Sequence, residues 1–195
     1  MNQILLADFF QTHGGILRTR QLQAGGFSHY HLNPLIQQGK ILKVKRGLYK
    51  WQTADQTELP EVASIVPSGV FCLLTAGTHY DLTTFSASAY YVAIPRKAKV
   101  TLPDYPPIKL YYWNETAYQL GRTTVILNGT VLPIYDKEKT VCDFLRQRHK
   151  LGLDVAKEVL TNYLRRPDRQ IARLVEYASQ LGLSQYVDTT LNVLL

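Results

Sequence analysis

The sequence predicts an α+β protein in which a small, basic N-terminal unit precedes a larger unit whose strands come before its helices. The first observation is charge, because residues 1–51 carry seven basic residues and one acidic residue, or +6 of the chain's net +7. The second is order, because β-forming runs between residues 89 and 135 are followed by helical patterns, which favours α+β over alternating βαβ units. The third is residues 52–60, a polar stretch typical of a linker. We therefore expect a first domain over 1–51 and a second over 61–195.

The N-terminal domain is expected to begin with a helix packed on a small core. Residues 2–10 are rich in apolar side chains, and a Gly-Gly pair then ends the helix. Residues 16–17 fit a short strand. Thr19 is the expected N-cap of a short helix that runs through Ala24, and a second Gly-Gly pair forms the turn after it.

A second helix and a hairpin are expected after this turn. Ser28 is the expected N-cap of the helix, and Gly39 is a suitable stop at its C-terminal end. Residues 41–45 and 48–51 fit two short strands around Arg46–Gly47, where glycine supplies the positive φ of a tight turn. Two helices joined by a glycine turn and followed by a hairpin form a winged helix-turn-helix.

Pro34 falls inside the second helix of this motif and leaves two geometries open. A proline in a helix interior removes a backbone donor and costs about 3 kcal/mol if nothing relieves it. The helix either bends at Pro34 or begins late, with Asn33 as its cap and Pro34 at its first position, which would leave His29–His31 in a turn. We expect a kinked or delayed helix.

Segregated positive charge on a winged helix-turn-helix predicts a double-stranded DNA partner, because a basic face attracts a polyanion. The start of the second helix is expected to present base-reading groups to the major groove, and the wing cations to face phosphates or the minor groove. The candidate DNA-binding residues are Arg18, Arg20, Ser28, His29, Tyr30, His31, Asn33, Gln37, Lys40, Lys43, Lys45, Arg46 and Lys50. The simpler alternative is a solvated basic surface, with histidines that contact nothing. Tyr30 and Tyr49 are expected to be partly packed rather than stacked on bases.

The second domain is expected to be rich in strands in its first half and helical at its C-terminal end. A short helix over 61–65 and a helix from Ser68 through Thr78 open it. Asp136 is the expected N-cap of a charged helix that runs to about His149. The remaining predicted elements are strands at 89–94, 108–113, 123–127 and 131–135 and helices at 153–164, 168–180 and 184–194.

Composition indicates a cytoplasmic protein, and the predicted DNA binding would associate it with the nucleoid. Cys72 and Cys142 both have apolar neighbours, and we expect them to be reduced core residues rather than a disulfide. No signal peptide is recognisable, and no apolar run approaches the ~20 residues that a membrane span needs.

Nothing in the sequence indicates catalysis, and we expect no enzyme activity, cofactor or metal. There is no glycine-rich phosphate loop, no HExxH motif and no CxxC motif. Asp136, Glu138 and Asp143 are explained by capping and by the helix dipole, and Asp143 is placed to pair with Lys139 one turn away. His79 at a helix end is more often structural than a base. The basic clusters at 146–150 and 165–173 are expected to be solvated helix ends; their alternative is a contact with the DNA backbone or with an acidic patch of a neighbouring protomer.

Several segments resemble the AbiEi antitoxins of type IV toxin–antitoxin, or abortive-infection, systems. Residues 14–22 (GGILRTRQL), 26–28 (GFS) and 39–49 (GKILKVKRGLY) resemble the N-terminal winged helix of that family. Residues 71–83 and 131–143 (VLPIYDKEKTVCD) resemble its later segments, so the resemblance spans nearly the whole chain. Pro34 departs from the family's second helix, which affects the expected helix geometry rather than the resemblance.

The resemblance implies an antitoxin that also represses its own operon. It implies operator DNA with inverted repeats and functional pairing with a nucleotidyltransferase-type toxin, without a required stable complex. We expect the protein to self-associate on DNA through its second domain.

Two alternatives remain open on the sequence. One is a ligand-responsive winged-helix regulator without a toxin partner, whose second domain would use the aromatic residues Tyr90, Tyr91, Tyr111, Tyr112 and Trp113 to line a pocket. The other is an enzyme whose cleft would gather Asp136, Asp143 and His79.

Overall fold

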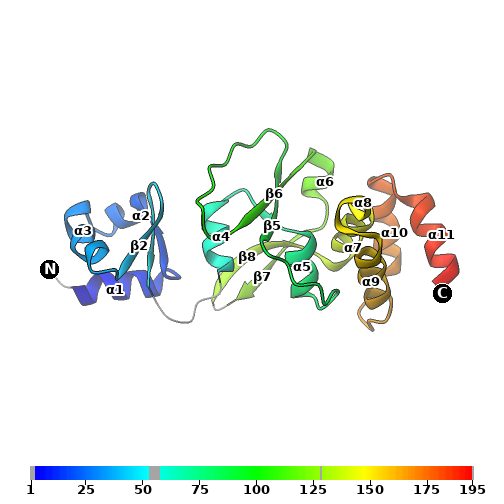
Figure 1. Ribbon diagram of the computed structural model, residues 1–195, viewed down its shortest axis with the longest axis horizontal. Coiled ribbons are helices and arrows are strands. Elements are labelled where there is room, and N and C mark those ends of the chain that lie inside the picture. Colours follow the sequence, from blue (N-terminus) through cyan, green and yellow to red (C-terminus); the bar gives the residue numbers. More distant parts are fainter. Residues whose placement is uncertain (1–2, 53–57, 128, 195) are drawn as a thin grey trace. The chain divides into compact units, whose positions relative to one another are not determined.

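The computed structural model describes residues 3–52, 58–127 and 129–194 and has the predicted α+β class (Figure 1). The chain divides into two compact units. Unit 1 comprises residues 1–67, 100–106 and 126–132, and unit 2 comprises 68–99, 107–125 and 133–195. Most of the predicted linker lies outside the described residues. Unit 1 includes part of the chain that the sequence prediction places in the second domain, and the domain boundaries stay a prediction.

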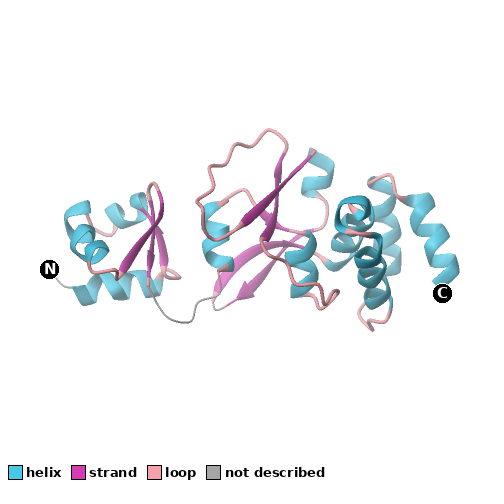
Figure 2. Cartoon of the chain, in the orientation of Figure 1, coloured by secondary structure: helices cyan, strands magenta, loops and turns pink. Residues whose placement is uncertain are grey.

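The N-terminal elements of unit 1 form a winged helix-turn-helix with one further helix. Its three-stranded antiparallel sheet has the order β1-β3-β2, and Figure 2 shows its helices in cyan and its strands in magenta. Both wing strands have the bounds that the sequence predicts. The elements are α1 (Gln3–Thr12), β1 (Ile16–Arg18), α2 (Thr19–Ala24), α3 (His29–Gln37), β2 (Ile41–Lys45), β3 (Leu48–Trp51) and α4 (Leu59–Ile65).

A small apolar core holds the winged helix together. Leu32 and Leu35, one turn apart on α3, are 1% and 5% exposed. Burying a leucine side chain fully stabilises a fold by about 2 kcal/mol. Their partners in this core are Leu6, Phe10, Leu17, Leu22, Ile41 and Tyr49. Because α3 buries this side, its opposite side is left for solvent or a partner.

Two expectations for these helices are corrected. Thr19 is the first residue of α2 rather than its N-cap, which is Arg18 in an extended conformation. The Arg18 backbone N–H donates to the Gln21 side chain at 2.9 Å, which is the bond that the third helical residue makes back to the N-cap in a capping box. The delayed start of the second helix is also wrong, since α3 begins at His29 and contains Pro34 in its interior.

The geometry around Pro34 explains why the helix tolerates this residue. The missing N–H would have bonded the carbonyl of Tyr30 four residues earlier. Tyr30 is 84% exposed, so water can hydrate that carbonyl. Ser28 is the N-cap, as expected, and its backbone N–H donates to His31 Nδ1 at 3.1 Å. Ser28 and His31 thus fix the start of α3, and this stabilisation offsets part of the free energy that Pro34 costs in the helix interior.

A five-stranded sheet follows, with the order β6-β5-β4-β8-β7. Its pairings are mixed: β5 is parallel to β6 and antiparallel to β4, and β4 is parallel to β8. The strands are β4 (Val70–Phe71), β5 (Tyr90–Pro95), β6 (Ile108–Trp113), β7 (Arg122–Leu127) and β8 (Thr130–Tyr135). The four predicted strands are therefore present, and β4 adds a central strand that the sequence did not predict.

Helices that pack on one another form the C-terminal part. They are α7 (Lys137–Arg146), α8 (Arg148–Leu151), α9 (Leu153–Leu164), α10 (Ile171–Gln180) and α11 (Ser184–Leu194), preceded by α5 (Leu73–His79) and α6 (Glu115–Gln119). Asp136 caps α7 as expected, with its side chain accepting the Lys139 N–H at 2.8 Å. Among the described residues, no helix is both long and apolar enough to cross a bilayer.

Three predicted helix bounds are wrong. Ser68 caps no helix, because Val70 and Phe71 pair between β5 and β8, and α5 begins only at Leu73. The helix expected to reach His149 ends at Arg146, and α8 restarts it after Gln147. The helix expected from Asp168 begins at Ile171 with Gln170 as its N-cap, and the Asp168 carboxylate pairs with Arg166 and Lys137.

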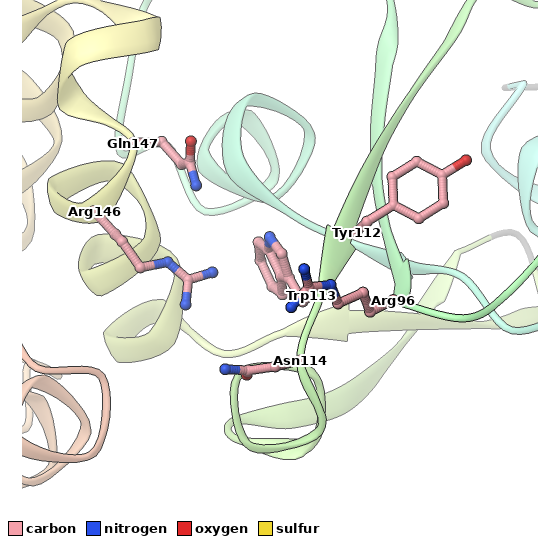
Figure 3. Close-up of a pocket in the computed structure, with 6 residues that line it drawn as sticks. All are labelled: Arg96, Tyr112, Trp113, Asn114, Arg146 and Gln147. Carbon is pink, nitrogen blue, oxygen red and sulfur yellow. The ribbon is translucent and has the colours of Figure 1, made fainter.

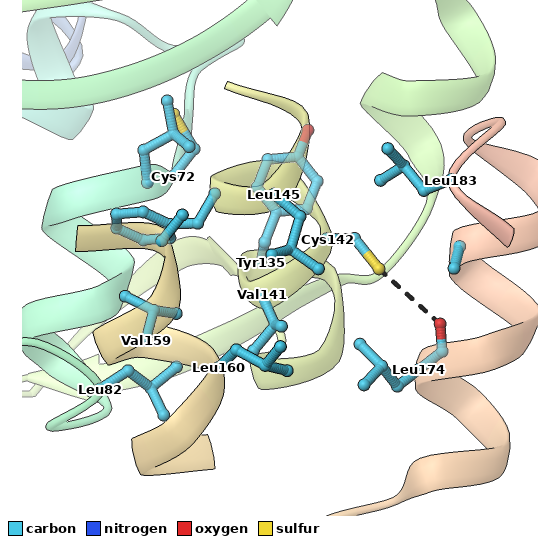
Figure 4. Packing of buried hydrophobic residues seen from close by; sticks show 14 of the residues in the cluster. Cys72, Leu82, Tyr135, Val141, Cys142, Leu145, Val159, Leu160, Leu174 and Leu183 are labelled. Atoms are coloured by element: carbon cyan, nitrogen blue, oxygen red, sulfur yellow. Dashed lines mark hydrogen bonds between the residues drawn. The ribbon is translucent and has the colours of Figure 1, made fainter. Parts of the chain in front are cut away.

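The core of unit 2 joins α5, α7, α9 and α10 with the sheet (Figure 4). Cys72 and Cys142 are both free and buried in it, as expected, and the Cys142 thiol lies 3.7 Å from the Leu174 carbonyl. Lys139 and Asp143 form the predicted i,i+4 pair at 2.7 Å, but both side chains are fully buried rather than on an exposed helix face.

Candidate nucleic-acid interface

The exposed side of α3 is polar along its whole length. We call Ser28, His29, Tyr30, Asn33 and Gln37 the α3 face; all five residues are exposed. Asn33 and Gln37 are four residues apart, so their amides lie on the same side of the helix, one turn from each other. An exposed helix face with two amides and no acid is suited to base edges, because Asn and Gln offer both a donor and an acceptor.

Two histidines of the predicted site have contacts of their own. The Nδ1 of His31 accepts the Ser28 N–H, which requires that this nitrogen be unprotonated. The His29 ring packs edge-on against Tyr49, with ring centroids 6.2 Å apart. His29 stays exposed, whereas His31 is half-buried and helps to fix the start of α3. Tyr49 is packed more completely than expected, at 3% exposed, and the expected partial packing of Tyr30 is wrong, because this residue is 84% exposed.

Four of the predicted cations project to solvent. Arg46 lies in the turn of the wing, before Gly47, whose φ of 76° is the left-handed conformation that the turn needs. Lys43 is exposed on β2, and Lys40 precedes this strand. Arg20 is exposed on α2. We call Arg20, Lys40, Lys43 and Arg46 the exposed cations; no side-chain hydrogen bond or ion pair is recorded for them among the described residues.

The other three cations turn toward α4. Arg18 Nη2 donates to the Ser64 carbonyl at 2.6 Å, and Lys45 Nζ donates to the Ile65 carbonyl at 2.8 Å. Both groups therefore bind the C-terminal end of α4, where a helix presents unpaired carbonyls and partial negative charge. Lys50 Nζ pairs with the Glu61 carboxylate in the first turn of α4 at 2.5 Å. We call Arg18, Lys45 and Lys50 the α4 clamp.

The electrostatics of the α4 clamp differ from those of a free basic surface. Burial, and then the charge of Arg18, lower the pKa of Lys45. The Lys50 and Glu61 side chains are only 16% and 7% exposed. Three of the seven basic residues of the first 51 therefore bind the protein itself. The predicted basic residues thus divide into the exposed cations and the α4 clamp. The number of charges in the sequence did not show this division.

The other predicted candidates divide into residues with structural partners and residues that are exposed. Arg148 stacks on Tyr186 and Arg166 pairs with Asp168, while His149, Lys150, Arg165, Arg169 and Arg173 are exposed. For the enzyme alternative, Asp143 is buried against Lys139, and Asp136 caps α7 and accepts a hydrogen bond from the Tyr177 hydroxyl at 3.0 Å. Burial raises the pKa of Asp136, whose hydrogen bonds from Lys139 and Tyr177 act in the opposite direction. These carboxylates are thus explained by helix capping and packing.

Comparisons with known proteins agree with the N-terminal assignment. Residues 5–49 match the family model described as "Transcriptional regulator, AbiEi antitoxin", which confirms the predicted resemblance for the segment from α1 to β3. The N-terminal segment is thus similar to a family of transcriptional regulators and antitoxins. No curated protein matches the chain.

Solved structures with a similar fold exist, and one of them is a mycobacterial protein. The RV2827C protein from Mycobacterium tuberculosis superposes with a TM-score of 0.53 at 13% sequence identity, covering 94% of this chain and 77% of that chain. At this identity the likeness concerns the fold alone, and it extends beyond the winged helix to nearly the whole chain.

Proposed function

We propose that the protein is a DNA-binding transcriptional autorepressor and the antitoxin of a type IV toxin–antitoxin system, acting in the cytoplasm on the nucleoid. The observation that carries the DNA-binding part is the combination on one winged helix of a polar α3 face and four exposed cations. The match of residues 5–49 to a regulator family supports the same reading.

In this proposal α3 enters the major groove of operator DNA. Asn33 and Gln37 contact base edges, and Ser28, His29 and Tyr30 contact phosphates or bases near the start of the helix. Lys43 and Arg46 place the wing against phosphates or in the minor groove of the DNA. Arg20 and Lys40 contact the DNA backbone beside α3. Arg18, Lys45, Lys50 and His31 act on DNA indirectly, by holding α4 and the start of α3.

The antitoxin part of the proposal rests on the family resemblance. Inverted repeats in the operator, self-association through residues 61–195 and a nucleotidyltransferase-like toxin without a required stable complex all come from it. We propose no catalytic role for the chain.

A gel-shift titration of the full chain tests the DNA-binding proposal. The probe is the DNA upstream of its own gene, with scrambled DNA as competitor, at two or more salt concentrations. We expect a specific shift that weakens as salt rises. The double variant Lys43→Ala/Arg46→Ala should lower the slope of log affinity against log salt by about two, since each phosphate contact contributes about 0.9.

The matched control removes two exposed lysines elsewhere, as Lys99→Ala/Lys157→Ala, and should leave the slope unchanged. Equal, weak binding to both DNAs would remove autorepression from the proposal. An unchanged slope in the Lys43→Ala/Arg46→Ala variant would show that the wing does not touch phosphate.

A further inference from the structure

Unit 2 contains an open pocket of about 370 Å³ whose lining is rich in hydrogen-bond donors (Figure 3). Arg96 follows β5, Tyr112 and Trp113 end β6, and Arg146 and Gln147 end α7. Asn114, which caps α6, completes the lining. None of these six residues is acidic. The proposed DNA-binding site uses none of them, so the pocket is a separate feature.

Trp113 has a buried donor without a partner. Its side chain is 4% exposed, and its Nε1 is the buried side-chain nitrogen or oxygen that lacks a hydrogen-bond partner among the described residues. An indole N–H can only donate, so it needs an acceptor. Leaving a buried donor unpaired costs about 1–3 kcal/mol. In Figure 3 the nitrogen edge of the indole is turned toward Gln147, in the midst of the lining residues.

Positive charge surrounds this donor. The Arg146 guanidinium lies 5.0 Å from the centroid of the Trp113 ring, and Lys139 Nζ lies 4.0 Å from it. Asp143 neutralises Lys139 at 2.7 Å and lies 3.6 Å from Arg146. Arg96 lines the same pocket, so three cations stand against one buried carboxylate in this region, a net charge of two that is available to a ligand.

We propose that this pocket binds the phosphate group of a small phosphorylated ligand. The two guanidinium groups and the Trp113 N–H are its main donors. Asn114 adds its amide N–H₂, because its Oδ1 is already occupied by the Ala117 N–H at 2.9 Å. Arginine forks match phosphate oxygens in pairs. Donors that come from three separate parts of the fold suit a tetrahedral anion with several acceptors better than a planar carboxylate.

A small ligand fits the site better than a DNA backbone does. Solvent does not reach the Trp113 Nε1 in this structure, so a ligand contacts it only when a side chain of the pocket lining turns aside. A group that enters the pocket can make this contact, whereas the phosphates of a rigid duplex stay at its rim. This inference goes beyond the proposed function and supplies what the ligand-responsive alternative would require.

Heteronuclear NMR of the full ¹⁵N-labelled chain tests the proposal. The chain has two tryptophans, so the spectrum shows two indole N–H signals, and the Trp113→Phe variant assigns them. During titration with inorganic phosphate we expect the Trp113 signal to shift saturably and the Trp51 signal to stay in place. The same titration with sodium chloride should leave both signals unchanged. Absence of a saturable shift, or an equal shift with chloride, would overturn the proposal.

Variants separate the site from general charge effects. Arg96→Gln removes an exposed guanidinium and should weaken phosphate binding about tenfold or more, as expected for the loss of a charge-assisted hydrogen bond. Trp113→Phe keeps the ring under Lys139 and removes only the donor, and calorimetry should show a similar loss. Arg165→Gln, an exposed arginine of the same unit, is the matched control. Equal affinity in Arg96→Gln and Arg165→Gln would overturn the proposal even if Trp113→Phe does not fold.

The source of the phosphate is identified by comparing ligands. If adenosine monophosphate binds at least tenfold more tightly than inorganic phosphate, the bound phosphate belongs to a nucleotide. If the two affinities are equal, the ligand is the free phosphate anion. Both results support the proposal. Duplex DNA that reproduces the Trp113 shift and displaces phosphate would contradict a small-ligand site.

Discussion

The ion pair of Lys139 and Asp143 is the least expected feature at the residue scale. Its atoms are 2.7 Å apart and fully buried, and Lys139 Nζ also lies 4.3 Å from the centroid of the Tyr135 ring. A Cβ at Gly121 would meet the Lys139 Cβ at 2.5 Å, so glycine lets the chain pass over the lysine. Burial raises the pKa of Asp143 and lowers that of Lys139, and each partner opposes the shift of the other. The pair is therefore stable only as a unit.

Breaking this pair from one side should destabilise the fold more than replacing both partners. Lys139→Met or Asp143→Asn leaves a buried charge uncompensated, and we expect each to lower the free energy of unfolding by about 3–5 kcal/mol. The double variant Lys139→Met/Asp143→Leu removes both charges and should lose clearly less. Urea unfolding of the three variants measures this, and a double variant whose loss equals the sum of the single losses would contradict the account.

Glu158 makes the stability of the fold depend on pH, so that the free energy of unfolding falls as the solution becomes more acidic. Its carboxylate accepts three hydrogen bonds at 2.8 Å, from the Thr84 N–H and from the hydroxyls of Thr83 and Thr84. The backbone bond from Thr84, followed by the two hydroxyl bonds, lowers the pKa of Glu158 below its ordinary 4.5. The folded state then binds this proton less readily than the unfolded state. Its contribution to stability is complete above the ordinary pKa and is lost as pH falls through the lowered one.

Removal of this carboxylate should flatten the acid side of the stability profile. We expect Glu158→Gln to weaken the fall in unfolding free energy from about pH 5 to about pH 3. The control Glu176→Gln, on the exposed side of α10, should keep the slope of the parent chain. Thermal unfolding followed by circular dichroism at several pH values is the measurement. Identical slopes for Glu158→Gln and the parent would show that the threonine bonds do not stabilise the charged form.

Glycines and capping residues in the sequence predicted the helices and strands whose ends depend on neighbouring residues. β2, β3, β6, α9 and α11 have the predicted bounds, and most of them are delimited by glycines or caps that are visible in the sequence. β4 was missed because two residues become a strand only through neighbours that are far apart in sequence. α6 was missed because five residues carry too little periodicity, although Asn114 is a regular N-cap.

Long-range contacts also decide which basic residues of the candidate site are exposed and which belong to the α4 clamp, and local sequence does not predict them. Strand alternation places Lys43 and Lys45 on one face of β2. The register shifts between these two residues, however, so that Lys43 opposes Tyr49 and Lys45 opposes Leu48. Such a bulge re-aims a side chain, and here Lys45 binds the end of α4. Neither the bulge nor α4 as its partner was visible in the charge pattern.

The α4 clamp should therefore affect stability, and the exposed cations should affect DNA affinity. Lys50→Ala leaves Glu61 buried without its cation, and we expect it to lower the free energy of unfolding by about 2–3 kcal/mol. Lys43→Ala should change stability by less than about 0.5 kcal/mol, as exposed substitutions usually do. Urea unfolding and DNA titration of both variants distinguish the two roles. Equal effects of Lys50→Ala and Lys43→Ala on both quantities would contradict the division.

In the molecule as a whole, most of the net charge lies in the N-terminal segment and the larger hydrophobic core lies in unit 2. The N-terminal segment contributes a small core and most of the net charge, while the buried cluster from Val70 to Val187 lies entirely within unit 2. The fold class and the winged helix followed from pattern and composition. The long-range features did not, because unit 1 also includes residues 100–106 and 126–132, and no local pattern indicates which unit a distant segment joins.

Removal of the first 51 residues tests whether the two functions proposed above are separable. A chain of residues 52–195 keeps the complete core of unit 2 and all six residues of the phosphate pocket, so we expect it to fold, to bind phosphate and to lose operator binding. α4 would lose Arg18, Lys45 and Lys50, and its amides should exchange with solvent much faster than in the full chain. Hydrogen exchange and DNA titration on both chains are the measurements. Operator binding that survives the deletion would move the DNA contact to the exposed basic residues at 146–150 or 165–173, and protected α4 amides would show that the helix is stable without its clamp.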